Sequence, residues 1–287
     1  MQIIQLPTDR IEYLKLALPS AGPGLVAEWG TQITPFTVAA WDHAGMPTGW
    51  QLTSQTLNLA PDGEWVSVFY KPSREVRVTR VGAGGPSAVV RRPGKTDNVW
   101  TAVAPGGVAV AWKDDTVTVV SALPGGGEIA RRKTGFGFDL RFSPGGRWLT
   151  ERGHPSFRVL DRTNDYRVFA RLPTPRDWWA GVTDGATAVI TDMDRGTASV
   201  WDMTTNSATA VLPAGRWASA AAISADGRRV LTGNTECDVS LWDAGGERLR
   251  QYAWGVNTPI AAAFAADGTR AAVGGTDGRI VVWDLDE

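Results

Sequence analysis

Short apolar runs separated by turn residues make up most of the chain. Runs of four to seven residues, rich in β-branched and aromatic side chains, alternate with glycine, proline, aspartate and asparagine, and a helical period is nowhere sustained. This pattern predicts an all-β protein. Its clearest stretch predicts four strands, at residues 218–224, 229–233, 239–242 and 248–252.

A glycine that ends a turn recurs behind the expected first strand of each stretch. The seven positions are Gly24, Gly63, Gly107, Gly146, Gly185, Gly227 and Gly268, separated by 39, 44, 39, 39, 42 and 41 residues. About 40 residues is the length of a propeller blade of four antiparallel strands. We therefore expect a seven-bladed β-propeller, with residues 1–287 forming a single domain.

Side-chain size and burial pattern favour the same architecture. In Ile280-Val281-Val282-Trp283 both faces of the expected strand are apolar, which is typical of a sheet packed between two neighbouring sheets. The expected first strands are small, with alanine at 220–222 and 261–263. Strands that converge on a central channel have room only for small side chains.

The last unit is one strand short. Behind Gly268 the chain supplies two strands and then stops, whereas residues 2–6 have the pattern of a spare strand. We expect residues 2–6 to pair with the last blade and close the ring, because an open ring would leave an exposed strand edge. This arrangement also leads us to expect a complete chain.

Three units end their third strand in Trp-Asp, at Val200-Trp201-Asp202, Leu241-Trp242-Asp243 and Val282-Trp283-Asp284, and each follows an Asp-Gly turn. On these residues the chain resembles the WD-repeat β-propellers. Residues 142–161 match more loosely, and Ala40-Trp41-Asp42 is the clearest match in the first three units. The resemblance implies a non-enzymatic scaffold that binds a protein or peptide.

One part of the family pattern is missing. Members usually carry a histidine before the first strand, bonded to an aspartate of the second turn and to the tryptophan of the third strand. The two histidines here, His43 and His154, lie elsewhere. We therefore expect the blades to be held mainly by packing, with local substitutes such as Asp277 or Glu236.

Composition limits the classes of partner. The apolar fraction is 43%, the net charge is −1, and no apolar run approaches the roughly 18 residues of a membrane span. The first ten residues lack the segments of a signal peptide, and a single cysteine allows no intrachain disulfide. We expect a cytoplasmic protein, and 24 arginines against 5 lysines suggest a GC-rich bacterial genome.

Positive charge is concentrated in residues 71–133, which carry eleven Lys/Arg against five Asp/Glu. This basic sector includes Arg77, Arg80, Arg91 and Arg92. It predicts, as an alternative function, binding of nucleic acid or of another acidic partner. A solvated face without a partner explains the same charge.

Residues for catalysis or metal binding are scarce. A hydrolytic nucleophile needs a neighbouring base, and zinc needs three or four Cys/His ligands. Cys237 and the two histidines fall in turns of different units. An enzyme with its site in the channel would need clustered carboxylates there, for which only Asp97 and Glu12 are candidates. We expect no enzyme activity, no cofactor and no metal.

Residues just ahead of each first strand should line the mouth of the central channel. Aromatic and arginine side chains are enriched at interaction hot spots, so a group of them around Arg176 is expected to hold an extended peptide. Packing between blades is the alternative role for each tryptophan. The candidate partner-binding residues are Asp97, Phe136, Arg176, Trp178, Trp179, Trp217 and Thr258.

Overall fold

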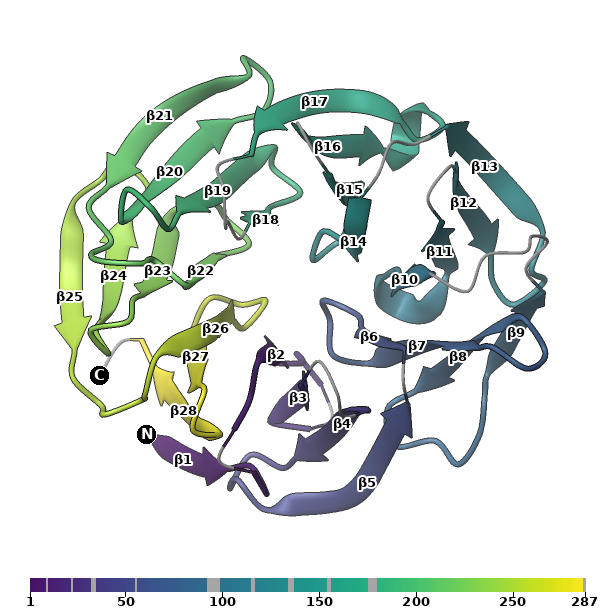
Figure 1. Cartoon of the computed structure of the whole chain (residues 1–287), viewed down its shortest axis with the longest axis horizontal. Helices are drawn as coiled ribbons and strands as arrows, with labels where there is room; N and C mark the ends of the chain where they lie inside the picture. The colour runs from purple at the N-terminus through teal and green to yellow at the C-terminus, as the bar shows by residue number, and fades with distance from the viewer. Residues whose placement is uncertain are drawn as a thin grey trace.

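The computed structural model describes residues 1–8, 10–21, 23–31, 35–54, 56–91, 99–114, 117–133, 137–153, 156–174 and 180–285. Seven four-stranded antiparallel sheets stand around a central axis (Figure 1). The expected seven-bladed β-propeller is confirmed. Within the described ranges the only helical segments are two short 3-10 turns, η1 (Pro105–Gly107) and η2 (Arg162–Asn164).

The strands of each blade follow one another from the axis to the rim (Figure 1). Blade 1 contains β2 (Tyr13–Ala17), β3 (Leu25–Gly30), β4 (Phe36–Trp41) and β5 (Pro47–Ser54). Blade 2 contains β6 (Leu57–Leu59), β7 (Trp65–Tyr70), β8 (Glu75–Arg80) and β9 (Ala88–Arg91). Blade 3 contains β10 (Trp100–Val103), β11 (Ala109–Lys113), β12 (Val117–Ala122) and β13 (Glu128–Lys133). Blade 4 contains β14 (Gly137–Phe142), β15 (Trp148–Gly153), β16 (Ser156–Asp161) and β17 (Arg167–Pro173).

The remaining three blades repeat this order. Blade 5 contains β18 (Ala180–Val182), β19 (Thr187–Asp192), β20 (Thr197–Asp202) and β21 (Ser207–Leu212). Blade 6 contains β22 (Ala220–Ile223), β23 (Arg229–Gly233), β24 (Val239–Asp243) and β25 (Arg248–Tyr252). Blade 7 contains β26 (Pro259–Phe264), β27 (Arg270–Gly275), β28 (Arg279–Asp284) and, from the other end of the chain, β1 (Gln2–Gln5). All seven turn glycines fall between the first and second strands of their blades, as expected.

The ring closes by pairing its first strand with its last. In this antiparallel pair Gln2 lies opposite Val282 and Gln5 opposite Arg279, and the two labelled chain ends lie near each other (Figure 1). The amide of Leu6 continues the contact by donating to the Gly278 carbonyl at 2.9 Å. Ile4 is buried in the core. The expected closure is therefore confirmed.

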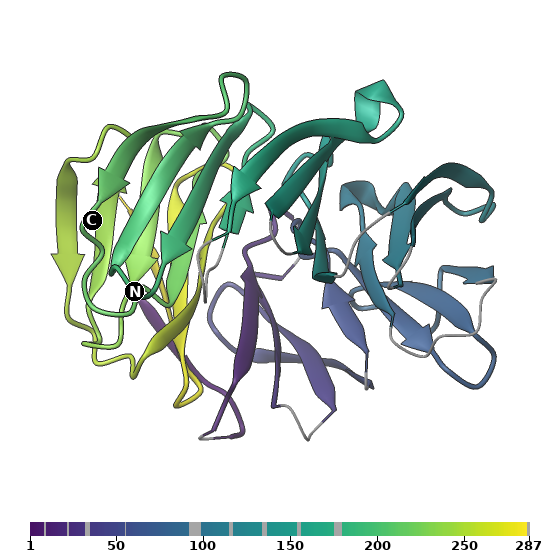
Figure 2. The same ribbon diagram turned by 45° about the horizontal axis from the view of Figure 1, so that its top comes forward.

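Apolar clusters fill the spaces between neighbouring blades, which pack face to face around the ring (Figure 2). On β28, Ile280 and Val282 pack with blade 1, whereas Val281 and Trp283 pack with blade 6. A strand that is apolar on both faces is thus buried from both sides, as the sequence pattern predicts. Trp112 fills the corresponding space between blades 2 and 3.

Polar side chains link the second turn of a blade to the loop before its first strand. In blade 7, Asp277 accepts hydrogen bonds from the amides of Arg279 at 3.2 Å and Asn257 at 3.5 Å. In blade 6 these bonds are made not by the expected Glu236, which aligns with Asp277, but by Asn234, two residues earlier. Its Nδ2 donates to the Ala214 carbonyl at 3.0 Å while its Oδ1 accepts from backbone amides of the turn. An amide suits this place because it donates and accepts at once.

Candidate functional site

Only part of the predicted channel mouth lies within the described residues. Trp217 and Thr258 do, and they precede β22 and β26, the first strands of blades 6 and 7. The hydroxyl of Ser219 donates to the Pro259 carbonyl at 2.7 Å, which holds the starts of these two strands side by side. The predicted residues that lie outside the described ranges are Asp97, Phe136, Arg176, Trp178 and Trp179.

Trp217 presents its indole on a restrained piece of backbone. The side chain is 52% exposed, although the next residue, Ala218, is fully buried. The φ angle of Trp217 is +54°, which is uncommon for a bulky residue. The preceding carbonyl, that of Arg216, accepts hydrogen bonds from both the amide and the hydroxyl of Thr235. The surrounding loop thus holds an exposed aromatic ring in a backbone conformation that costs energy, a combination that is frequent at binding sites.

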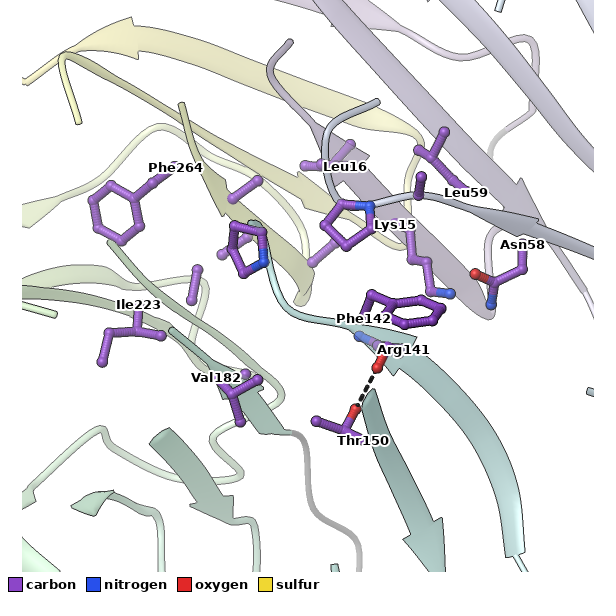
Figure 3. A pocket seen from close by; sticks show the side chains of 18 of the residues that line it. Lys15, Leu16, Asn58, Leu59, Arg141, Phe142, Thr150, Val182, Ile223 and Phe264 are labelled. Atoms are coloured by element: carbon purple, nitrogen blue, oxygen red, sulfur yellow. Dashed lines mark hydrogen bonds between the residues drawn. The ribbon is translucent and has the colours of Figure 1, made fainter. Parts of the chain in front are cut away.

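Below the mouth, a cavity of about 170 Å³ is lined mainly by first strands and by the turns that follow them. Figure 3 shows Val182, Ile223 and Phe264 on one side of this cavity, with Lys15 and Asn58 on the other. The expectation that small side chains line the channel holds for blades 6 and 7, which contribute Ala222 and the alanines at 261–263.

Charged residues gather where blades 1 and 4 face the channel. Lys15 on β2 lies opposite Glu28 on β3, and Asp139 on β14 lies opposite Arg152 on β15. The Nε of Arg141 donates to Asp139 Oδ2 at 2.8 Å. Together with Tyr13, these five residues form what we call the channel charge cluster. All of its members except Lys15 line a second cavity of about 340 Å³, which shares Asn58 and Arg141 with the first.

Enclosure within the ring changes the proton affinities of this cluster. Burial raises the pKa of Tyr13 and of Glu28 and lowers the pKa of Lys15, in each case by disfavouring the charged form. Burial would also lower the pKa of Arg141, but attraction to carboxylates, chiefly Asp139, outweighs it and raises that pKa. Groups with shifted pKa values inside a cavity are candidates for a functional site.

The channel charge cluster is not among the sites predicted from the sequence. A lysine on the first strand of blade 1 and an Asp-Leu-Arg run on that of blade 4 contrast with the alanines at 220–222 and 261–263. Charged residues on strands that are expected to face the channel are therefore the sequence feature that could have revealed the cluster. That Lys15 and Arg141 share a cavity depends on ring geometry, since they are 126 residues apart (141 − 15).

The basic sector is partly neutralised by the chain itself. Arg77 lies 3.2 Å from Glu75 and stacks over the Tyr70 ring at 4.1 Å, and Arg80 lies 3.7 Å from Glu64. Arg91 is exposed on the outer strand β9, and Arg92 lies outside the described ranges. Arg80 and Arg91 are exposed, whereas Arg77 is half-buried.

The chain matches no protein-family model, and no curated protein matches it. In the part of the chain that the structure describes, no helix has the length and apolar character needed to cross a membrane. The same residues include no group of three or more His, Cys, Asp or Glu that could hold a metal ion.

Proposed function

We propose that this chain is a WD-repeat propeller that acts as a non-enzymatic scaffold and binds a protein or peptide at the channel mouth around Trp217. The observation that carries the proposal is the exposed indole of Trp217 on its restrained, left-handed backbone. Propellers commonly serve as protein-interaction scaffolds. Tryptophan is among the residues most enriched at interaction hot spots because it buries a large area at low entropic cost.

Features of the third strands support the WD-repeat assignment. β20, β24 and β28 each end in Trp-Asp. In blade 6 the Trp242 Nε1 donates to the Thr232 hydroxyl of the neighbouring strand at 2.9 Å, and both residues are buried. This bond gives the Trp242 indole a partner on the neighbouring strand although the histidine is missing.

A pull-down from native extract, with Trp217→Ala compared with the parent chain, tests the proposal. Leu249→Ala is the matched control, because Leu249 is similarly exposed, at 49%, but lies on the rim strand β25 of the same blade. We expect a partner that is retained by the parent and by Leu249→Ala and lost with Trp217→Ala. Unchanged thermal melting of both variants would show that only the surface was altered.

The salt dependence of binding separates this proposal from the basic-sector alternative. Contacts to nucleic acid weaken steeply between about 50 and about 200 mM salt, whereas a tryptophan-centred site should be much less sensitive. Material that binds the parent and both variants equally and is released by salt would contradict a binding site at Trp217. It would instead favour an acidic partner at Arg77, Arg80 and Arg91.

A further inference from the structure

The cavity inside the ring has the size of a small ligand group. Its volume is about 170 Å³, and its apolar wall includes Leu16, Phe142, Val182, Ile223 and Phe264 (Figure 3). An apolar protein cavity of about 150 Å³ is sufficient to bind benzene. The space therefore fits one aromatic ring or a short branched alkyl group.

Lys15 is one of four polar residues that line this otherwise apolar space, together with Asn58, Arg141 and Thr150. Its Nζ is shielded from solvent and has no hydrogen-bond partner in the described part of the chain. Figure 3 shows the Lys15 side chain ending beside Asn58 and the ring of Phe142. The Nζ of Lys15 lies 5.7 Å from the centroid of the Tyr13 ring, which can attract the charge but leaves the N–H donors unused. Shielded donors without a partner are costly, so an acceptor supplied by a ligand would stabilise the cavity at this point.

The carboxylate opposite Lys15, that of Glu28, already accepts hydrogen bonds from other groups. Although Glu28 lies opposite Lys15, its Oε2 accepts a hydrogen bond from the Leu59 amide at 2.7 Å, across the boundary to blade 2. The Tyr13 hydroxyl also bonds to Glu28. Glu28 thus attracts Lys15 electrostatically but is used to join two blades.

The balance of charge favours an anion. Counted over the described residues alone, the ionised channel charge cluster contains three cations, Lys15, Arg141 and Arg152, and two anions, Glu28 and Asp139, which is a net charge of +1 (3 − 2). One added carboxylate would make the cluster neutral. Neutrality matters here because charges that are withdrawn from water are strongly penalised unless they are paired.

We propose that the channel binds a small amphipathic monocarboxylate. Its apolar group occupies the cavity bounded by Phe142, Ile223 and Phe264, and its carboxylate accepts hydrogen bonds from Lys15 Nζ beside Asn58. This site is separate from Trp217 and does not depend on the protein partner proposed above.

Phenylacetate and its neutral counterpart phenylacetamide test the site by calorimetric titration of the full chain. The two probes share the ring and differ in charge. Charge-assisted hydrogen bonds are substantially stronger than neutral ones, so we expect phenylacetate to bind at least about tenfold more tightly than phenylacetamide. It should also raise the melting temperature. Failure of both probes to bind, or equal binding of the two, would overturn the proposal.

Variants locate the binding within the channel. Lys15→Met should weaken phenylacetate at least about tenfold and abolish the preference for the acid, while Lys71→Met, at an exposed lysine, should change neither. Ala263→Leu adds bulk at the cavity wall and should exclude both probes while Lys15 is retained. If Lys15→Met binds phenylacetate as tightly as the parent, Lys15 does not bind the carboxylate and the proposal is wrong on this point.

A peptide ending in phenylalanine presents the same chemistry as the free acid. Gly-Gly-Phe with a free and with an amidated C-terminus, titrated in the same way, separates the two sources. Tighter binding of phenylacetate than of the free tripeptide supports a free small acid. Tighter binding of the free tripeptide would contradict a free small acid as the ligand. It would show instead that the cavity receives the C-terminus of a peptide.

Discussion

The hydroxyl of Ser143 in blade 4 donates a 2.6 Å hydrogen bond to the carboxylate of Asp184 in blade 5. The same carboxylate accepts bonds from the amides of Gly145, at 2.5 Å, and Arg147, at 2.9 Å. One side chain thus satisfies three donors in the first turn of the neighbouring blade. Asp62 of blade 2 makes a similar link to blade 3 by accepting from the Gly106 amide at 2.8 Å.

Asp184→Ala should lower the free energy of unfolding by about 2 to 3 kcal/mol, since hydrogen bonds to a charged group are individually strong. Urea denaturation measures this loss. Asp194→Ala is the control, because Asp194 is exposed on a turn of the same blade, and it should change stability by less than about 0.5 kcal/mol. Equal effects of the two substitutions would mean that Asp184 does not hold the blades together.

Two adjacent isoleucines test the closure of the ring. Ile4 is 4% exposed and packs in the core, whereas Ile3 on the other face of β1 is 51% exposed. We expect Ile4→Ala to cost about 2 to 5 kcal/mol and Ile3→Ala less than about 0.5 kcal/mol. Removal of residues 1–7 should sharply lower the melting temperature. An unchanged melt would contradict closure through β1.

Blades 6 and 7 offer a matched pair of substitutions. Thr232 provides the acceptor for Trp242 Nε1, but the equivalent position in blade 7 is Val273, and Trp283 Nε1 is buried without a hydrogen-bond partner. Thr232→Val should therefore cost about 1 to 3 kcal/mol by leaving a buried donor unsatisfied. Val273→Thr supplies an acceptor to Trp283 and should stabilise the protein by about 1 kcal/mol. Thermal melting of the two variants measures both effects, and a loss of stability in Val273→Thr would show that Trp283 needs no acceptor.

Glu28 should make stability fall as pH rises. Its pKa is raised by burial above the ordinary value of 4.5, so the folded state holds this proton more tightly than the unfolded state. The contribution of Glu28 to the free energy of unfolding is therefore largest below pH 4.5 and declines as pH rises through the folded-state pKa. The parent and Glu28→Gln, which keeps an acceptor for the Leu59 amide, are compared by urea denaturation across this range. The stability of the parent relative to the variant should decrease with pH, and an increase would contradict the raised pKa.

The fold was predictable because local turn chemistry marks its repeats. Glycine turns separate β22 from β23, and residues 229–233 and 248–252 match β23 and β25 in full. The channel charge cluster was not predictable from such signals. Lys15 and Glu28 lie in blade 1, where the Trp41-Asp42 pair does not signal charges in the channel, and Arg141 lies in the loosely matching blade 4. Only closure of the ring brings the three residues together. Trp217 could be placed by counting back from a first strand, but its exposure and left-handed backbone could not.

The pairing of β1 with β28 also dictates an order of assembly. Gln2 and its partner Val282 are separated by 280 positions (282 − 2). At about 5–20 residues per second, ribosomal synthesis needs on the order of tens of seconds to span that distance. Throughout this interval the apolar side chains of Ile4 and Leu6 lack their final cover. Strand β1 is therefore made before every other strand of this ring but cannot be paired until β28 has been made.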